Sequence, residues 1–501
     1  MFAGESLSCM SRVAIIGAGL GGLSAASQLI ANGYDVTIFE RESNVGGRAR
    51  RVTAQTPKGE YLTEIGPTVF TMLDVARIPF ETLGIDMDKR VEMIKVDPSY
   101  RGIFADGSSL DWSADKETRF QRITSLAGTD QAQGFEDYVS WLEKLVKVEY
   151  DKFVAKNFDS VFDLLKTPGA LARLLQMGAF SHMDKRVGKF ISDPRLISMS
   201  TFQALYAGVT PSQALAVYCI ISYMDLVQGV YYPKGGMCAY GEALADAMRD
   251  SGVKIHLETN VSKVETLRSG AHRIHSGNAN EDFDAVICNA DLAYAYPEIF
   301  ESDMPRRIRN GRYSPSCLVY VVGGSASSHL SNAHHTIHFS KDDKTSFDQL
   351  VKTKTMMTNP SFLVSRPTAS DPTISPDGTD VFYLLEPCPH LDSQVEFEKN
   401  RELHIERMRG HLTKAGIELS RVDCEIFIDP NDWEQQRMFR GTPFSLAHTF
   451  FQSGPFRPKN RIKSKPGLFF CGTGTTPGVG IPMVIESGRL SAEVAHKYLV
   501  G

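Results

Sequence analysis

The chain has 501 residues, of which 42% are hydrophobic and 23% are charged, and it carries a formal net charge of −5. This composition is typical of a folded globular protein, and the length predicts two or three lobes. It excludes a disordered chain, and the acidic balance argues against nucleic acid as a partner.

Cysteines and apolar runs predict the cellular context. The eight cysteines are scattered singly, without a Cys-x-x-Cys pair, which predicts a reducing compartment and no structural metal. Met1 to Ser11 lacks the basic and apolar regions of a signal peptide. The nearest candidate for a membrane span, Leu215 to Met224, is too short and ends at Asp225. We therefore expect a cytoplasmic protein whose membrane contact is peripheral.

A strand, a glycine turn and a helix follow one another near the N-terminus. The apolar run Val13 to Ile16 comes first, and Leu23 to Ala31 has helical character. The turn between them is Gly17-Ala18-Gly19-Leu20-Gly21-Gly22. In such a G-x-G-x-x-G motif Gly17 makes the turn, Gly19 lets the backbone approach a pyrophosphate, and Gly22 lets the helix pack on the strand. The helix N-terminus then faces the phosphates, so the motif predicts a dinucleotide site.

The residues after this motif extend the nucleotide pattern. A second strand, Asp35 to Phe39, places Glu40 near the position at which a carboxylate binds an adenosine ribose hydroxyl. A free ribose is expected, rather than a 2′-phosphate. Arg41 and a second glycine pair with an arginine, Gly46-Gly47-Arg48, follow the acid. This combination favours a bound nucleotide over the alternative, a sheet turn without a ligand.

The middle of the chain changes from strand patterns to helical ones. A strand is expected from Leu62 to Thr71 with a turn at Gly66-Pro67, and Val91 to Trp112 is typical of a β-meander. Phe120 to Tyr223 is largely helical by its apolar spacing. Two interpretations stay open for this segment: core packing, or a lid that dips into a bilayer. Basic residues available to anionic head groups are Lys166, Arg173, Lys185, Arg186 and Lys189.

The later chain alternates between the two lobes. After the glycine turn Gly229 to Met237, we expect a helix at Tyr240 to Ser251 and strands at Lys254 to Glu258, Val261 to Thr266 and Asp284 to Cys288. Strands separated by turns are expected from Ser314 to Glu386, and a helix at Phe397 to Ala415. A last strand, Gly467 to Gly472, leads through a second glycine turn into a helix, Met483 to Tyr498. The amides of that turn predict a second cofactor clamp.

Several of these blocks together resemble the bacterial-type carotenoid (phytoene) desaturases, which are flavoproteins of the amine oxidase superfamily. The similarity extends from Val13 to about Tyr498. The blocks most specific to that family include Glu64 to Thr68, Phe202 to Tyr206, Tyr231 to Gly236, His334 to Phe339, Phe456 to Pro458 and Gly472 to Pro482. The resemblance implies a two-lobed, FAD-binding, Rossmann-like α/β fold (GR2-type) with a mixed-sheet substrate lobe and a helical lid.

The resemblance also implies domain boundaries and cofactor contacts. The FAD-binding lobe is expected from residues 1–90, 229–300 and 456–501, and the substrate lobe and helical lid from residues 91–228 and 301–455. Val261 is expected in the third strand of the nucleotide sheet, against adenine, although simple strand burial explains a valine there equally well. The expected FAD contacts are Gly17, Ala18, Gly19, Leu20, Gly21, Gly22, Glu40, Arg41, Gly46, Gly47, Arg48, Gly66, Pro67, Val261, Gly472, Thr473, Gly480 and Ile481.

The activity that the resemblance implies is an FAD-dependent dehydrogenation of a hydrophobic C40 polyene, from phytoene stepwise toward lycopene, at a membrane surface. Because a developing cation is delocalised along the polyene, the enzyme mainly has to position the chain and exclude water. Oxygen or a quinone is the expected electron acceptor. The alternatives are a desaturase of a later, hydroxylated or shorter carotenoid, an amine or protoporphyrinogen oxidase, and a flavin-free prenyl-binding escort protein.

Candidates for acid–base chemistry are few. Asp163 and Lys166 match an acid and a cation one helical turn later in some members of the family, and the alternative is a solvated helix pair. His334 and His335 begin a strand, where neighbouring residues face opposite ways, so we interpret both as structural. The terminal block departs from the family pattern at Met483, where a glycine is usual. A thioether there narrows the pocket beside the flavin and leaves the substrate and the number of steps open.

Overall fold

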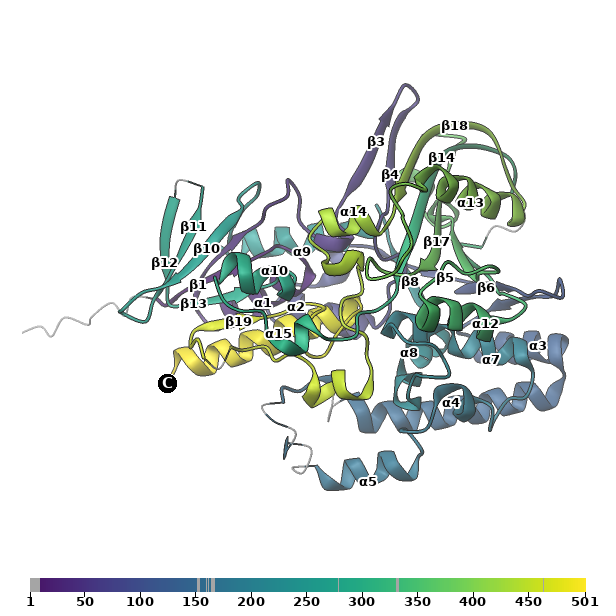
Figure 1. Cartoon of the computed structure of the whole chain (residues 1–501), viewed down its shortest axis with the longest axis horizontal. Coiled ribbons are helices and arrows are strands. Elements are labelled where there is room, and N and C mark those ends of the chain that lie inside the picture. Colours follow the sequence, from purple (N-terminus) through teal and green to yellow (C-terminus); the bar gives the residue numbers. More distant parts are fainter. Residues whose placement is uncertain are drawn as a thin grey trace, which may run out of the picture.

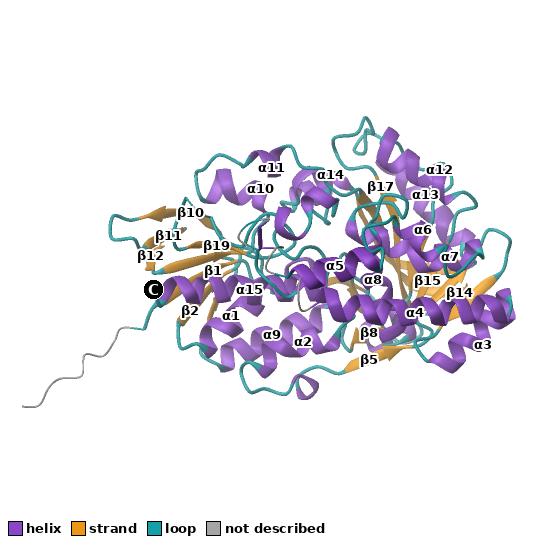
Figure 2. Ribbon diagram, turned by 90° about the horizontal axis from the view of Figure 1, so that it is seen from below, coloured by secondary structure: helices purple, strands orange, loops and turns teal. Residues whose placement is uncertain are grey.

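The computed structural model describes residues 10–150, 154–158, 160, 162–163, 167–277, 279–329, 333–462 and 464–501. Two lobes lie side by side, the first around a parallel sheet and the second around a larger sheet, with a group of helices along one side of the second lobe (Figure 1). Figure 2 shows the same arrangement from below, with the helices crossing in front of the large sheet. The two-lobed α/β fold that was expected is confirmed.

The first lobe is built on a five-stranded parallel sheet in the order β19-β13-β1-β2-β9. The strands are β1 (Arg12–Ile16), β2 (Asp35–Phe39), β9 (Lys254–His256), β13 (Ala285–Cys288) and β19 (Leu468–Phe470). The strand β1 is almost entirely apolar because both faces of the sheet are covered. Val13 and Ile15 pack in one apolar cluster with residues of α1 (Leu20–Ala31), α9 (Cys238–Asp250) and α15 (Ile481–Leu499).

A three-stranded antiparallel sheet covers the opposite face of this parallel sheet. Its strands are β10 (Val261–Thr266), β11 (His272–Ser276) and β12 (Ala279–Phe283). Ala14 and Ile16 of β1 pack there in a cluster with Val261 and Ile274. The expectation that Val261 belongs to the nucleotide sheet was therefore wrong, because β9 completes that sheet by pairing with β2 while β10 pairs with β11.

The second lobe is built on a seven-stranded sheet in the order β18-β14-β17-β16-β15-β6-β7. Neighbouring strands are antiparallel except β15 and β6, so the sheet is mixed, as expected. Its strands are β6 (Tyr100–Ile103), β7 (Ser109–Trp112), β14 (Ser316–His329), β15 (His335–His338), β16 (Phe362–Ser365), β17 (Asp380–Cys388) and β18 (Ile417–Ile428). Two strand pairs lie beside it: β3 (Val52–Thr56) with β4 (Gly59–Thr63), and β5 (Met93–Val96) with β8 (Val230–Pro233).

Helices from the middle of the chain complete the second lobe. They are α3 (Lys116–Ala127), α4 (Thr129–Glu149), α5 (Pro168–Gln176), α6 (Met183–Val187), α7 (Pro194–Thr201) and α8 (Cys219–Tyr223), followed by the π-helix η7 (Met224–Gln228). The remaining helices are α2 (Leu73–Glu81), α10 (Leu292–Tyr294), α11 (Arg306–Arg309), α12 (Asp343–Asp348), α13 (Arg401–Lys414) and α14 (Pro430–Gln435). None of the helices in the described ranges is both long enough and apolar enough to span a membrane.

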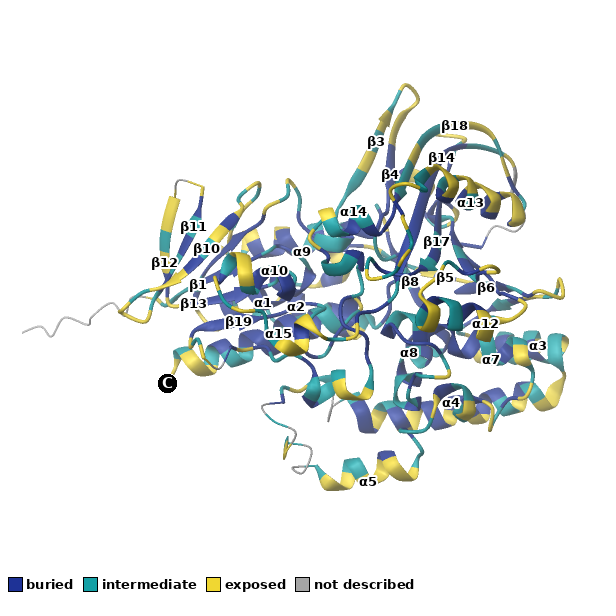
Figure 3. Ribbon diagram, viewed as in Figure 1, coloured by how far each residue is buried: buried dark blue, intermediate teal, exposed yellow. Residues whose placement is uncertain are grey.

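One buried apolar cluster connects the two lobes. It includes Ile15 and Leu23 of the first lobe and continues through Phe80 to Phe135 and Leu142 on α4. The α4 residues recur at helical spacing, which is why one face of that helix is buried. In contrast, α5 lies at the edge of the molecule with much of its surface exposed (Figure 3).

Candidate cofactor and substrate site

One cavity, of about 1880 Å³, extends from the first lobe into the second. At one end it is lined by Ile16, Phe39 and Asn289, which lie at the carboxyl ends of the parallel strands, where ligands of such sheets bind. In the second lobe it is lined by Leu174 of α5 and Leu385 of β17, among others. A pocket for one small molecule usually has about 300–1,000 Å³. The cavity therefore has room for a cofactor and a second molecule.

The first glycine turn forms part of the cavity wall through Gly17, Gly19, Leu20 and Gly21. Gly17 has a φ of +100°, a conformation that favours glycine. A Cβ added at Gly19 would lie 2.8 Å from the Asn289 side-chain nitrogen. The helix α1 begins without a side-chain cap, so its first amides are free to bind an anion.

Two further residues of this motif, Ala18 and Gly22, lie behind the cavity wall and support its conformation. The Ala18 N–H donates to Glu40 Oε2 at 2.7 Å. A Cβ at Gly22 would lie 2.2 Å from the Gly17 carbonyl oxygen, so only glycine lets the helix approach the strand this closely. Neither residue is among those that line the cavity.

Glu40 is buried at the end of β2 and lines the cavity. Its carboxylate accepts hydrogen bonds from the N–H groups of Ala18 and Glu42, at 2.7 and 2.9 Å. A carboxylate offers about four acceptor sites, so about two remain for hydroxyl groups of a ligand. Arg41 and Val261 line the same cavity.

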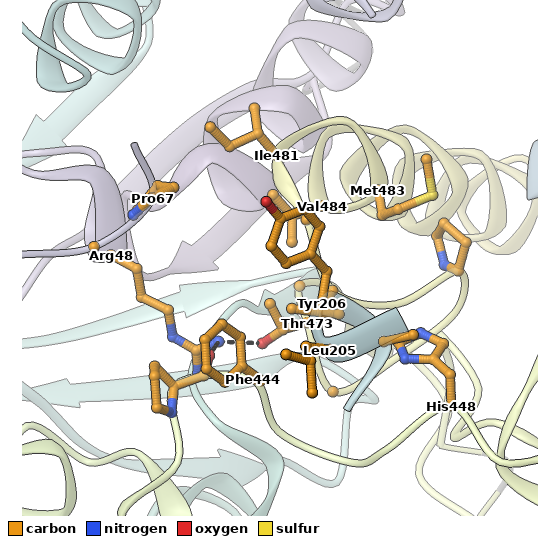
Figure 4. A pocket seen from close by; sticks show the side chains of 18 of the residues that line it. Arg48, Pro67, Leu205, Tyr206, Phe444, His448, Thr473, Ile481, Met483 and Val484 are labelled. Atoms are coloured by element: carbon orange, nitrogen blue, oxygen red, sulfur yellow. Dashed lines mark hydrogen bonds between the residues drawn. The ribbon is translucent and has the colours of Figure 1, made fainter. Parts of the chain in front are cut away.

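The second glycine pair contacts the first glycine turn. The Gly46 N–H donates to the Ala18 carbonyl oxygen at 2.9 Å, and a Cβ at Gly47 would lie 3.0 Å from the Gly19 Cα. Arg48 donates to the Pro443 carbonyl oxygen and to Thr473 Oγ1, each at 2.7 Å (Figure 4). Burial lowers the pKa of Arg48, and the Asp291 carboxylate opposes this effect. Arg48 thus joins the second glycine pair to the C-terminal loop.

The C-terminal loop supplies a second helix N-terminus. Gly472 and Gly480 have φ values of +101° and +114°, and α15 begins at Ile481 without a side-chain cap. Gly472, Thr473, Gly480 and Ile481 all line the cavity, as do Gly66 and Pro67. The first-turn amides of α15 are therefore also available to a ligand.

Arg457 holds this loop in place through hydrogen bonds. We did not expect this role from the sequence, although the residue lies in the block Phe456 to Pro458. It is fully buried and donates to the carbonyl oxygens of Thr473 and Thr475, at 2.6 and 2.9 Å. It also donates to those of Leu446 and Gln452. Burial lowers the pKa of Arg457 to about 10. Its sequence signal is only an arginine between Phe456 and a proline, which does not predict burial.

These features fit FAD. Two helix N-termini lack a side-chain cap, and two glycine turns leave space that a Cβ atom would occupy. Together these features suit a pyrophosphate and the polar edge of a flavin. The Glu40 carboxylate suits a ribose. In this way the described residues provide donors and acceptors for a pyrophosphate, a ribose and the polar edge of a flavin.

The part of the cavity beyond the C-terminal loop is largely apolar. Leu205, Phe444, Met483 and Val484 surround it, with Tyr206 between them (Figure 4). Met483 does line the cavity, as its position in the terminal block predicts. Such a wall suits a long hydrocarbon and excludes water.

Exposed residues form part of the cavity wall beside α5. Aromatic and aliphatic residues cluster there, and we call them the apolar rim: Leu171, Leu174, Leu175, Phe180, Phe450, Phe451 and Phe456. Phe451 is 73% exposed and Leu175 60% exposed. The ring of Phe450 contacts those of Phe451 and Phe180, with centroids 5.1 and 6.3 Å apart. The rim thus combines residues of α5 and the segment after it with the later loop that contains Phe450, Phe451 and Phe456.

The residues expected to do acid–base chemistry lie elsewhere. Asp163 is half-buried and accepts from the Ser160 N–H at 2.8 Å; it is not among the residues that line the cavity, and its catalytic role stays a prediction. Lys166 lies outside the described residues. His335 hydrogen-bonds the carbonyl oxygens of Thr68 and Ser99, and neither it nor His334 lines the cavity. These contacts are those of structural histidines.

Two buried acids that line the cavity were missed. They are Glu149, at the end of α4, and Asp225, in η7. Burial raises the pKa of Glu149 well above its ordinary range and that of Asp225 to about 7. The available signal was the charge of Asp225 directly after the apolar run that ends at Met224, which we interpreted only as the end of that run.

Comparisons with known proteins agree with this site. The model of the flavin-containing amine oxidoreductase family matches residues 20–496. A Streptomyces griseus protein named phytoene dehydrogenase is 39% identical over 493 residues, which cover 97% of this chain and 95% of that protein. The zeta-carotene-forming phytoene desaturase of Myxococcus xanthus is 33% identical over 498 residues, 96% of this chain and 93% of that protein. The structure of cyclohexylamine oxidase from Brevibacterium oxydans is similar with a TM-score of 0.59 and 17% identity, covering 98% and 100% of the two chains, which shows a shared fold.

Proposed function

Because the chain belongs to the flavin-containing amine oxidoreductase family and is an FAD-dependent carotenoid desaturase, we propose that its reaction is the stepwise dehydrogenation of phytoene toward lycopene. The observation that carries this proposal is the continuous cavity, which connects the two glycine turns with an apolar chamber that extends to residues of the apolar rim. FAD supplies the two-electron oxidant at the glycine turns. A C40 hydrocarbon extends from there along the apolar chamber.

The protein's own part in this reaction is to hold the polyene and keep water away. Leu205, Val484 and Met483 surround the chamber beside the C-terminal loop. Arg48 and Arg457 fix that loop through Thr473 and Thr475. Correct placement of the reacting carbons is a large share of catalysis when the substrate itself stabilises the developing charge.

The substrate enters from a membrane through the apolar rim. Exposed aromatic rings suit the acyl boundary of a bilayer, and Arg173, Lys185 and Lys189 are exposed nearby on the same segment for anionic head groups. Arg186, expected among these cations, instead packs over the Trp141 ring, 4.7 Å from its centroid. The protein therefore binds the cytoplasmic membrane surface peripherally, where a membrane quinone is a suitable electron acceptor and dissolved oxygen is the alternative.

A desaturase of a shorter, later or hydroxylated carotenoid is the second candidate. Met483 favours it, because its side chain lines the cavity where the family usually has glycine and so reduces the space beside the flavin. The remaining candidate functions are disfavoured: FAD use argues against an escort protein, and the relatives argue against an amine or protoporphyrinogen oxidase.

Pigment analysis of a bacterial host that accumulates phytoene tests the proposal. Chromatography of the extract with this chain expressed should show lycopene, and any intermediates count the steps. The same host without the chain is the control. Unchanged phytoene beside a flavin-loaded protein would reject phytoene as substrate and favour the shorter or later carotenoid.

A further inference from the structure

Removal of two hydrogens from a –CH2–CH2– unit also releases a proton. FAD, as the oxidant of the proposed function, accounts for one hydrogen with its electron pair. The second hydrogen leaves as a proton, and the apolar chamber keeps out the water that would otherwise accept it. A basic side chain that lines the cavity is suited to accept this proton directly.

Asp225 has the position for this role. It lies in η7, between α8 and β8, is 2% exposed, and lines the cavity. The Tyr100 hydroxyl donates to Asp225 Oδ2 at 3.0 Å. Oδ1 accepts no hydrogen bond from any residue in the described part of the chain. One carboxylate oxygen is thus fixed while the other is free.

Among the described residues, the groups that face Asp225 carry no positive charge. Tyr100 lies on β6, between the rings of Phe202 and His335, whose centroids are each 5.4 Å from its own. Tyr206, whose ring centroid is 5.9 Å from that of Phe202, itself lines the cavity. Burial raises the pKa of Asp225 to about 7, and the hydrogen bond from Tyr100 opposes this effect. The carboxyl group can therefore exchange a proton near neutral pH.

Some other buried carboxylates of this chain are paired with arginines, whereas Glu64 accepts from the Tyr232 hydroxyl and the Met237 N–H. Asp380 accepts from Arg366, Glu386 from Arg407, and Asp429 from Arg401. No lysine, arginine or histidine within the described ranges forms an ion pair with Asp225. An unpaired buried acid costs stability, so its place in the cavity wall is explained better by chemistry than by folding.

We propose that Asp225 is the proton acceptor of the dehydrogenation. One C–H bond of the –CH2–CH2– unit gives its hydrogen and both electrons to the flavin, which is reduced. The C–H bond on the neighbouring carbon gives its proton to Asp225 Oδ1, and the electron pair of that bond forms the new C=C bond. The inference rests on the proposed function only in that a carotenoid loses two hydrogens.

Glu149 is the rival acceptor. It also lines the cavity, is buried, and has an Oε2 without a partner in the described part of the chain. No hydrogen bond from a described residue orients it, however, and burial raises its pKa well above its ordinary range. Burial thus favours its protonated form. The geometry favours Asp225, because one of its oxygens is fixed by Tyr100 and its side chain lines the cavity.

Steady-state kinetics of the FAD-loaded enzyme on phytoene in vesicles test the proposal. Asp225→Asn should lower kcat about 100-fold or more with little change in KM, and Asp225→Glu should recover part of the rate. The wild-type rate should rise with pH through about 7. Tyr100→Phe should move that midpoint upward, because it removes the hydrogen bond that lowers the pKa of Asp225. The control is Asp380→Asn, which changes a paired acid outside the cavity wall and should leave the profile unchanged.

A second readout does not depend on turnover. Infrared spectra of protein with ¹³C-labelled aspartate should show a carboxylic acid band that disappears as the pH rises through about 7 and that is missing in Asp225→Asn. The assignment would be overturned if Asp225→Asn kept the wild-type rate and pH profile. It would also be overturned if Glu149→Gln alone abolished the pH dependence of the rate. If the wild type leaves phytoene untouched, the proposed substrate fails, and the infrared titration still decides on Asp225.

Discussion

Buried carboxyl groups make the stability of this protein depend on pH. Burial raises the pKa of Asp225 from its ordinary value of 3.8 to about 7, and that of Glu64 from 4.5 to about 7. Between these values the folded state holds a proton that the unfolded state has lost. Each group's contribution to stability is therefore fully present below its ordinary pKa and is lost as the pH rises through about 7.

The free energy of unfolding should consequently fall between about pH 4 and pH 7, by up to about 4 kcal/mol for Asp225 alone, because a difference of one pKa unit contributes about 1.4 kcal/mol. Asp225→Asn has no proton to lose and should show a flatter dependence. Denaturant unfolding across this range measures both proteins. If the free energy of unfolding depended on pH in the same way in the variant and the wild type, the pKa of Asp225 would not be raised in the folded state.

At Gly19 a side chain competes with the cofactor. Gly19→Val should abolish FAD retention, because even its Cβ would lie 2.8 Å from the Asn289 side chain and the rest would enter the site of the pyrophosphate. The ratio of released flavin to protein measures this. Gly410→Val on α13 is the matched control, since a Cβ there meets nothing within 4 Å. Unchanged flavin content in Gly19→Val would remove the first glycine turn from the cofactor site.

Single residues show what the sequence could and could not predict about the site. Gly17, Gly19 and Glu40 could be placed because their relations are local: one turn and the next strand bring them together. Asp225 could not be placed, because its partner Tyr100 is 125 positions away and the contact depends on how η7 packs against β6. Arg457 was equally unpredictable, since its acceptors come from two loops that meet only in the fold.

For the secondary-structure elements, the sequence pattern predicted helices and strands correctly where the element buries one face. The strand at Asp35 to Phe39 and the helix of Phe135 and Leu142 are found as β2 and α4. The strand expected from Leu62 to Thr71 was wrong beyond Thr63, because the next residues form the loop that lines the cavity at Gly66 and Pro67. The strands β11 and β12 were missed, since their short alternating runs resemble exposed loops.

The apolar rim gives a prediction for the element that carries it. Phe451→Asp should weaken binding to anionic vesicles about tenfold or more, because a buried phenylalanine contributes about 1.5–3 kcal/mol and the new charge adds repulsion. Vesicle co-sedimentation measures the binding, and flavin content should not change. Leu403→Asp is the matched control, because Leu403 is 67% exposed on α13, away from the rim. Equal losses in both variants would argue against a specific docking face.

For the whole molecule, the order of the chain links the lobes. The parallel sheet takes β1 from the start of the described chain and β19 from near its end, while the mixed sheet takes its strands from between them. One apolar cluster then continues from β1 to α4. Neither lobe is therefore a continuous piece of chain, and the exact boundaries 1–90, 229–300 and 456–501 stay a prediction.

The two lobes should unfold together. The three tryptophans, Trp112, Trp141 and Trp433, lie in elements of the second lobe, whereas the glycine turns that we expect to hold the flavin belong to the first. Thermal unfolding followed by tryptophan fluorescence and by flavin release should give one common midpoint. Added FAD should raise both midpoints equally, because ligand binding stabilises the whole cooperative unit. Two separate midpoints would show that the lobes are independent.

A cavity that extends to an apolar rim also determines which concentration governs the rate. With the proposed docking of the rim on a membrane, the enzyme would meet its substrate only within the lipid layer to which it is bound. Its velocity then follows the mole fraction of carotenoid among the lipids, and added empty vesicles slow it by surface dilution even when the total amount of carotenoid is constant. Lipid supply thus becomes a kinetic variable of pigment synthesis.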